Sequence, residues 1–305
     1  MSSEPPRPPF RLRDIVGLDL DTPIRILDIG AMAEGEVRYD ALIRQGIAEV
    51  TGFEPNPEEI AKLKADRRDG CTWLPHVLGD GKPATFHKTR YPGCSSLFRP
   101  DPATIDLFVS LDATTADGNF TLIGTEEVET TRLDDVGECP AADYVKIDVQ
   151  GSKLDVLRHG AAKISGAMVI EAEVEFVPIY ESQPLFADLD AFMRDQGFLL
   201  HKFIDVAGRN FRPVADDNRF SATSQALWAD AVFVRDVRRI GEVSPTQLLK
   251  GAVILHEVYC SYDLAHLLLY AHDLGHNTAY APPYLEAIQA APSLPRLYMN
   301  LKEST

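Results

Sequence analysis

From residue 25 onward, short apolar runs alternate along the chain with amphipathic segments. This alternation is typical of βα units that build a parallel sheet. Residues 25–28 and 49–53 are predicted strands, and helical patterns follow each of them over residues 39–45 and 57–67. Pro57 suits the first turn of the second helix, where no backbone N–H is needed. Two consecutive βα units are therefore predicted.

The middle third of the chain has a different pattern. Between residues 72 and 133 the apolar positions fall into shorter pieces that glycine and proline interrupt, including an alternating stretch at 84–89 and a run at 120–132. A helical pattern appears only over residues 103–109. We therefore expect an insertion that is mainly β structure.

Buried-strand patterns return after this insertion. They cover residues 144–148, 168–173, 198–203 and 229–234. Helical patterns over 154–158 and 185–196 separate them, and the second places its apolar side chains on one face before Gly197 ends it. The sequence thus predicts an α/β fold with a mostly parallel sheet of about seven strands.

The two ends of the chain differ from this α/β region. Four prolines fall within residues 1–10, without the apolar run of a signal peptide or membrane anchor, so we expect a flexible leader over residues 1–22. The α/β domain is expected over 23–237. Residues 238–305 are expected to form a helical C-terminal appendage with Ser244 as a helix cap. Its apolar helices could form a lid or the face of a homodimer.

Composition and charge limit the possible partners. The formal net charge is −16, which opposes binding to a phosphate backbone, so we expect no nucleic-acid partner. The arginine pairs at residues 67–68 and 238–239 could still supply a local basic patch. The four cysteines are widely spaced, without a metal or redox motif, which favours a cytoplasmic protein with reduced thiols. We expect no membrane partner.

Acidic side chains stand at the carboxyl ends of several predicted strands. Asp28, Glu54 and Asp148 end three of them, and Glu171 and Glu173 lie at the end of a fourth. Ligands of open α/β sheets bind at these strand ends, although any one carboxylate could instead cap a helix. An acid after the second strand can accept hydrogen bonds from both hydroxyls of an adenosine ribose. The pattern fits either a nicotinamide dinucleotide or S-adenosylmethionine.

The glycines after the first strand separate these two ligands. A dinucleotide site needs G-x-G-x-x-G to place a pyrophosphate on a helix N-terminus. This chain has only Gly30 and Gly35 there, and Glu34 would repel a phosphate. Adenosylmethionine is therefore favoured. The alternatives are an NAD(P)-dependent oxidoreductase and a non-catalytic module that binds an adenosine ligand.

The chain contains the motifs Asp28-Ile-Gly-Ala31, Gly52-Phe-Glu-Pro-Asn56 and Lys146-Ile-Asp-Val-Gln-Gly151, of which the last is the most specific. These three motifs resemble those of the FkbM family of S-adenosylmethionine-dependent methyltransferases. Gln150 stands where the family usually has glutamate. Cys94-Ser-Ser-Leu97 and Thr131-Arg-Leu-Asp-Asp135 also match, and the similarity covers roughly residues 25–235.

The resemblance implies a Rossmann-like, mostly parallel sheet of seven strands. It also implies a cofactor, a reaction and a set of binding residues. The family transfers the methyl group of S-adenosylmethionine, commonly to a hydroxyl oxygen of a sugar, glycan or natural product. The resemblance places Asp148 nearest the sulfonium and Glu54 at the ribose. Matching positions imply that the other cofactor-binding residues are Asp28, Gly30, Ala31, Pro55, Asn56, Leu78, Gly79, Asp80, Ser96 and Gly151.

The loop after the first strand departs from the family pattern. The family loop usually continues G-A-N-x-G, whereas Met32 and Glu34 replace the asparagine and the glycine here. A longer path of this loop would bring Gly35 and Tyr39 to the cofactor instead.

Transfer to a hydroxyl needs an oxygen held in line with the methyl carbon and a base that removes the proton. We expect this base among Asp148, Glu171 and His201, although His201 could equally be a partly buried sheet histidine. Asp148, Glu171 and Glu173 could also bind a divalent metal, which we do not favour.

Two further side-chain groups have alternative interpretations. His272 and His276 have the spacing of a helical metal pair, but no third ligand is evident, so a solvated helix end is expected. Trp228, between Gln225 and Asp230, could stack on a sugar-like acceptor or pack in the core.

Overall fold

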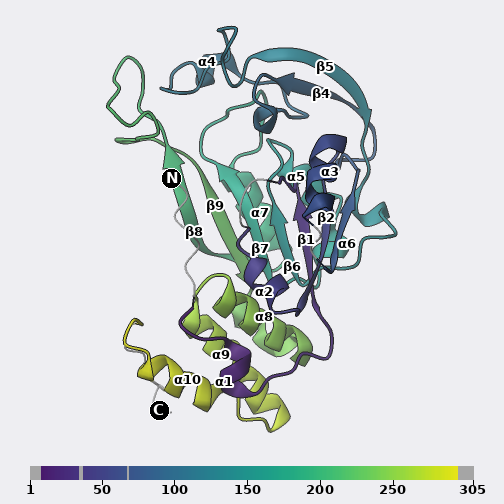
Figure 1. Ribbon diagram of the computed structural model, residues 1–305, viewed down its shortest axis with the longest axis vertical. Helices are drawn as coiled ribbons and strands as arrows, with labels where there is room; N and C mark the ends of the chain where they lie inside the picture. Colours follow the sequence, from purple (N-terminus) through teal and green to yellow (C-terminus); the bar gives the residue numbers. More distant parts are fainter. Residues whose placement is uncertain (1–7, 34–36, 67–68, 295–305) are drawn as a thin grey trace. The chain divides into compact units, whose positions relative to one another are not determined.

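The computed structural model describes residues 8–33, 37–66 and 69–294. The chain forms two compact units (Figure 1). Residues 1–24, 34–49 and 236–305 belong to the first unit, and residues 25–33 and 50–235 belong to the second unit.

A seven-stranded sheet has the order β3-β2-β1-β6-β7-β9-β8. Its strands are β1 (Ile24–Ile29), β2 (Ala48–Phe53), β3 (Cys71–Leu74), β6 (Tyr144–Ile147), β7 (Val169–Glu175), β8 (Phe198–Gly208) and β9 (Ala226–Arg235). The strand pairs β2–β3, β1–β6 and β6–β7 are parallel, whereas β9 runs antiparallel to both β7 and β8. The predicted seven-stranded, mostly parallel sheet is confirmed. Strand order reverses between β1 and β6, which is where such sheets bind ligands.

Four helices of the second unit accompany these strands. They are α3 (Pro57–Ala65), α5 (Lys153–Arg158), α6 (Ala161–Ile164) and α7 (Phe186–Asp195). Pro57 opens α3 as predicted, and Asn56 caps this helix by accepting a 2.9 Å hydrogen bond from the Glu58 amide. Helix α3 thus begins three residues after Glu54, and this fixes the carboxyl end of β2.

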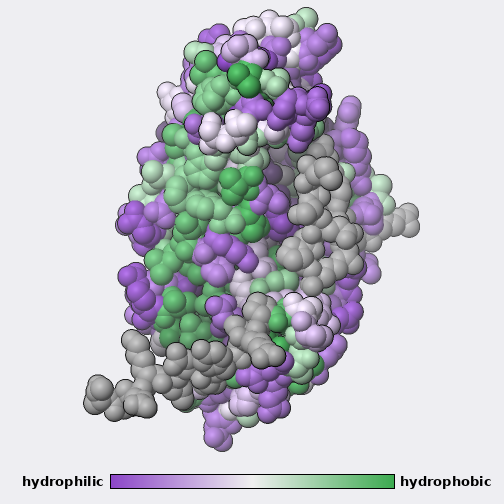
Figure 2. Space-filling view, turned by 90° about the vertical axis from the view of Figure 1, so that its left-hand side faces the viewer, coloured by the Kyte–Doolittle hydropathy of each residue, from purple (hydrophilic) through white to green (hydrophobic). Residues whose placement is uncertain are grey.

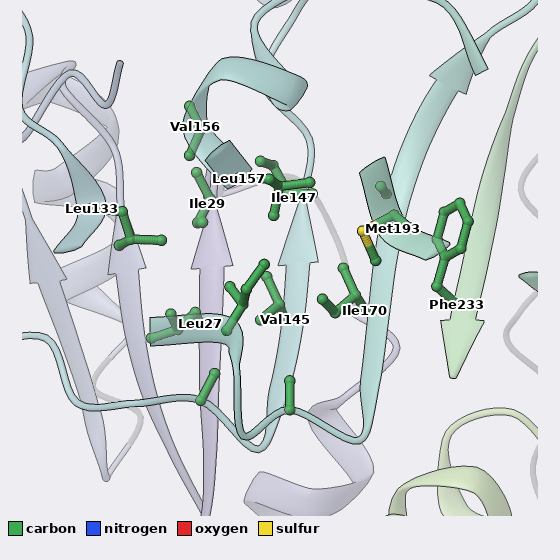
Figure 3. Close-up of a cluster of buried hydrophobic side chains, with 14 of the residues drawn as sticks. Leu27, Ile29, Leu133, Val145, Ile147, Val156, Leu157, Ile170, Met193 and Phe233 are labelled. Carbon is green, nitrogen blue, oxygen red and sulfur yellow. The ribbon is translucent and has the colours of Figure 1, made fainter. Parts of the chain in front are cut away.

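One face of the sheet carries the main hydrophobic core (Figure 3). Leu27, Val145, Ile170 and Phe233 are register partners across four adjacent strands, and each is fully buried. Met193 from α7 packs in the same cluster. Burying side chains of this size stabilises the fold by about 1.5–3 kcal/mol each. Because side chains alternate along a strand, the intervening residues share the opposite face.

The predicted β insertion is present in the second unit. It contains a two-stranded antiparallel sheet of β4 (Pro83–Thr89) and β5 (Leu122–Glu129), the short helix α4 (Pro102–Ile105), and the 3-10 turns Pro92–Cys94 and Leu133–Asp135. A second core cluster includes Phe108, Phe120, Tyr180 and Leu227, with Trp228 packed against it. The insertion is thereby joined to the segment after β7 and to β9.

The first unit is helical. It contains α1 (Leu12–Val16), α2 (Asp40–Arg44), the 3-10 segment Val237–Glu242, α8 (Pro245–Glu257), α9 (Tyr262–His276) and α10 (Ala281–Ala290). Ser244 caps α8 as predicted, since its hydroxyl accepts a hydrogen bond from the Gln247 amide. Residues 295–305 of the expected helical appendage lie outside the described residues.

The segment expected as a flexible leader is structured from residue 8 onward. Leu12 in α1 is fully buried, and its amide donates a 2.9 Å hydrogen bond to Glu257 Oε1. Phe10 O lies 2.8 Å from His256 Nε2, and that histidine is also fully buried. The prediction missed that α8 supplies polar partners for this segment. Residues 1–7 of the expected leader lie outside the described residues.

Within the described ranges, none of the helices has the length and apolar character needed to cross a bilayer.

Candidate active site

A row of charged side chains crosses the sheet on the face opposite the main core. Asp28, Lys146 and Glu171 are register partners on β1, β6 and β7. Lys146 Nζ lies 3.4 Å from Asp28 Oδ1, and the Tyr144 hydroxyl lies 3.3 Å from Glu171 Oε2. Burial lowers the pKa of Lys146, but the neighbouring carboxylates outweigh it and raise that pKa above its ordinary value. The structure thus places Asp28 and Glu171 in one ion network with Lys146.

Asp148 lies one step further toward the carboxyl end of β6. Its amide donates a 2.8 Å hydrogen bond to Ile29 O. Its Oδ1 is buried, and no hydrogen-bond partner for this atom exists among the described residues. A buried carboxylate oxygen without a donor is rare in proteins and indicates a missing ligand or water.

Gly30 and Ala31 form the turn beside Asp148. Gly30 has a φ of +84°, and a Cβ at this position would lie 2.1 Å from the Asp148 carbonyl oxygen. The amides of Gly30 and Ala31 donate to Phe53 O at 3.0 and 3.1 Å. Only glycine fits at residue 30, because both the backbone conformation and the close approach exclude a side chain. The turn joins the carboxyl ends of β1, β2 and β6.

Glu173 stands next to Asp148 on β7 and is held by two donors. Gln150 Nε2 and Lys153 Nζ each lie 3.3 Å from Glu173 Oε2. Lys153 also forms an ion pair with Glu175. Within the part of the chain that the structure describes, Glu173 Oε1 accepts no hydrogen bond. Burial, and then the charge of Asp148, raise the pKa of Glu173 to about 8.

Lys153 and Tyr180 were not among the residues that the sequence pattern indicated. The Tyr180 hydroxyl lies 2.9 Å from Cys94 O and 3.3 Å from Gln150 Oε1. Burial lowers the pKa of Lys153, but Glu175, Glu173 and Asp148 raise it above its ordinary value. The sequence could have indicated Lys153 as a site residue, because this lysine begins helix α5 soon after the carboxyl end of β6. Tyr180 carried no such signal.

Glu54 ends β2 in a buried position. It is 8% exposed, and its Oε1 accepts a 2.7 Å hydrogen bond from the Asn56 amide. Burial raises the pKa of Glu54 to about 7, although this hydrogen bond opposes the rise. Pro55 and Asn56 are exposed and join this carboxylate to α3.

Leu78, Gly79 and Asp80 precede β4. Leu78 forms an isolated bridge with Thr131, and the Gly79 amide donates a 3.0 Å hydrogen bond to Thr131 O. The Asp80 carboxylate pairs with Lys82 at 2.8 Å. Asp80 therefore already has a cationic partner, and an adenine edge would meet the backbone of this segment more readily than its carboxylate.

Ser96 connects the insertion to the loop after β6. Its hydroxyl donates to Gln150 O, and the Phe98 amide donates to the same hydroxyl at 2.9 Å. Gly151 has a φ of +78°, and a Cβ there would lie 3.3 Å from Ser96 Oγ. Ser96 thus positions the loop that carries Gln150 and Gly151.

The sequence also indicated His201, Tyr39 and Gly35 as site residues. His201 lies on the edge strand β8, at a register shift between Leu200 and Lys202, and β9 separates this strand from β7. Tyr39 is buried in the first unit. Gly35 lies outside the described residues. The structure therefore does not place His201 beside Asp148.

The sequence also indicated two possible basic patches and two possible groups of metal ligands. Arg238 pairs with Asp236 and Arg239 with Glu242, so these arginines are neutralised, and residues 67–68 lie outside the described part. Over residues 8–33, 37–66 and 69–294 no group of three His, Cys, Asp or Glu side chains is arranged for a metal. His272 stacks on His276 at 4.7 Å.

The strand order, its reversed last hairpin and the carboxylates at the ends of β1, β2 and β6 define a Rossmann-like fold of the class I methyltransferase type. The profile described as the methyltransferase FkbM domain matches residues 28–200, more than half of the chain. The chain belongs to this family, and it is an S-adenosylmethionine-dependent methyltransferase.

Solved structures of methyltransferases also show similarity. Magnesium protoporphyrin IX methyltransferase from Synechocystis PCC 6803, with bound SAM, is 12% identical at a TM-score of 0.36, with 70% of this chain and 71% of that chain covered. Precorrin-6y C5,15-methyltransferase from Geobacter metallireducens GS-15 is 12% identical at a TM-score of 0.33. The match covers 73% of this chain and 85% of that chain. A putative methyltransferase from Thermoplasma acidophilum is 8% identical at a TM-score of 0.36. The match covers 72% of this chain and 70% of that chain. No curated protein matches the chain.

Proposed function

We propose that this methyltransferase acts on a hydroxyl oxygen of a sugar, glycan or natural-product acceptor, at the carboxyl end of β6. The observation that carries the proposal is the pair of carboxylates at Asp148 and Glu173. Asp148 Oδ1 is buried without a donor, and Glu173 Oε1 accepts no hydrogen bond from the described residues. Two adjacent carboxylates suit a reaction in which a cation meets a hydroxyl that loses its proton.

The cofactor fits the residues around this pair. The turn at Gly30 leaves no room for a side chain, so the backbone itself can approach the methionine part. Glu54 can accept hydrogen bonds from the ribose hydroxyls, and Asp148 can orient the cofactor beside Gly30. When bound, S-adenosylmethionine supplies the methyl group, whose bond to sulfur breaks as the bond to the acceptor oxygen forms.

Glu173 is the proton acceptor that the geometry favours. A pKa of about 8 makes this carboxyl a stronger base than an ordinary glutamate, and Gln150 and Lys153 hold its other oxygen in place. Glu171 is less suitable because Tyr144 contacts it and it lies in the row of Lys146. Asp148 stays a candidate base, whereas His201 would require the acceptor to extend to the edge strand.

Calorimetric titration and a transfer assay test this proposal. We expect the protein to bind S-adenosylmethionine and its demethylated product, and to transfer labelled methyl groups to members of a panel of hydroxylated acceptors. Tight binding of a nicotinamide dinucleotide without S-adenosylmethionine binding would refute the proposal and favour an oxidoreductase. Cofactor binding without transfer to any acceptor would favour a binding module.

A pair of variants tests the role of Glu173. Glu173→Gln should lower kcat by about 10²- to 10⁴-fold, the usual contribution of a positioned base, with little change in cofactor affinity. Glu181→Gln, at an exposed carboxylate of the same unit, is the matched control and should keep full activity. An unchanged pH–rate profile in Glu173→Gln would exclude Glu173 as the base.

A further inference from the structure

The loop between β8 and β9 carries two arginines without an acidic partner. The guanidinium carbon of Arg209 lies 4.9 Å from the Trp228 ring centroid and 5.1 Å from that of Phe220, and the guanidinium carbon of Arg219 lies 4.6 Å from Phe220. Neither arginine forms an ion pair with any of the residues described, although the chain has a net charge of −16. In such an acidic protein, two neighbouring guanidinium groups without a counter-charge are unexpected.

Arg209 also has unused hydrogen-bonding capacity. Its Nη1 donates to Gly208 O, whereas its Nε is buried and has no partner among the described residues. Burial, and then the charge of Arg219, lower the pKa of Arg209. Asp216 of the same loop accepts hydrogen bonds from the Ser221 hydroxyl and the Asn218 amide. The two positive charges therefore repel each other, and a bound anion would remove this cost.

Arg209 contacts Trp228, and the register of β9 relates this residue to the carboxylates of β7. Trp228 pairs in register with Glu175, and Asp230 pairs with Glu173. Two residues along a strand correspond to about 7 Å, and side chains two apart share a face. Trp228, with Arg209 against its ring, thus lies one row beyond Glu173, on the same face of the sheet. Phe211 and Phe220 of this loop are exposed, at 43% and 50%. Figure 2 shows apolar surface, coloured green, on the face of the molecule that it draws.

We infer that Arg209 and Arg219 form a subsite for an anionic group of the acceptor, a carboxylate or a phosphate, while its hydroxyl lies at Asp148 and Glu173. The inference rests on the proposed function. Guanidinium groups bind both anions through paired N–H donors, and the rings of Trp228 and Phe220 hold their planes. Trp228 then acts by positioning Arg209, and not as the stacking platform for a sugar that the sequence suggested.

Binding of matched charged and neutral sugars tests the subsite. The probes are glucose 6-phosphate and glucuronic acid against glucose, titrated into the protein saturated with the demethylated cofactor. Charge-assisted hydrogen bonds of about 1.5–3 kcal/mol predict that at least one anionic sugar binds about 10- to 100-fold more tightly than glucose. In the double variant Arg209→Gln and Arg219→Gln this preference should be lost. A preference for only one of the two anionic sugars identifies the phosphate or the carboxylate as the group recognised.

The control is Arg194→Gln, which removes one positive charge at an arginine of the same unit that already pairs with Asp190. It should keep the full preference for the anionic sugar. If no anionic probe binds more tightly than glucose, or if the double variant keeps the preference, the inference is wrong. A double variant that melts at a lower temperature but keeps the preference assigns the arginines to stabilising the loop alone.

Failure of the inference can be distinguished from failure of the proposed function. Titration with the demethylated cofactor is performed first on the unaltered protein. Absence of cofactor binding contradicts the proposed function itself. Normal cofactor binding without a preference for anions contradicts only the anionic subsite.

Discussion

Replacing Glu54 by glutamine should stabilise the protein at high pH and weaken cofactor binding at the same time. Glu54 is 8% exposed, and burial raises its pKa from 4.5 to about 7. A difference of this size corresponds to about 3 kcal/mol of free energy, at 1.36 kcal/mol for each pKa unit. Glutamine keeps an oxygen that can accept the hydrogen bond from the Asn56 amide, so the substitution removes mainly the charge.

The sign of the pH dependence follows from proton binding. Between pH 4.5 and about 7 the folded protein keeps the proton of Glu54 while the unfolded chain releases it. The free energy of unfolding therefore falls as the pH rises through this window, and the cost stays constant above it. Glu54→Gln should be more stable than the unaltered protein by up to about 3 kcal/mol at pH 8, and the difference should vanish below pH 4.5.

The same substitution should reduce affinity for S-adenosylmethionine. Loss of one or two charge-assisted hydrogen bonds to the ribose predicts a decrease of about 10- to 100-fold. Urea denaturation at pH 5 and pH 8 measures stability, and calorimetry measures affinity. Glu58→Gln, at an exposed position of the first turn of α3, is the control for loss of a nearby charge. Unchanged affinity, or lower stability at pH 8, would show that Glu54 is not a buried ribose ligand.

Three further substitutions test the geometry at the end of β6. Gly30→Ala should abolish cofactor binding and lower Tm, because its Cβ would meet the Asp148 carbonyl at 2.1 Å; normal binding would contradict the turn geometry. Asp148→Asn should lower affinity for the sulfonium form about 10-fold more than affinity for its demethylated product, which calorimetry with both ligands measures. Ser96→Ala should cost about 1–3 kcal/mol in urea denaturation, because Gln150 O and an amide lose their partner. Unchanged stability would show that water replaces the hydroxyl.

The strands and the carboxylates at their ends were predictable because both follow local rules. The alternation at Leu27 and Asp28, with one side chain in the core and the next on the opposite face, is visible in the sequence and is confirmed. The helix cap at Ser244 is equally local. Helix α1 was missed because it is stabilised by Glu257, which is 245 residues distant from Leu12 in the sequence.

Partners within the site were less predictable than its residues. Glu171 and Glu173 are two apart on one strand and look equivalent in sequence, but the register places Glu171 opposite Lys146 and Glu173 beside Asp148. The contacts of Arg209 depend on a loop that folds back on Trp228, which no periodic pattern indicates. Sequence therefore predicts which residues reach the sheet edge, and tertiary register decides which of them meet.

The charge balance of the site explains why Gln150 is compatible with this fold where the family usually has glutamate. Asp148, Glu173 and Glu175 place three carboxyl groups around the cation of Lys153. A fourth carboxylate at residue 150 would face Glu173 across the 3.3 Å contact that Gln150 Nε2 now makes as a donor. With glutamine at residue 150 the site stays acidic enough to favour a sulfonium cation. The carboxyl group of Glu173 can still take up a proton near neutral pH. Loss of the methyl group removes the positive charge from the cofactor, so under the proposed function we expect Asp148 to bind the product less tightly than the sulfonium form.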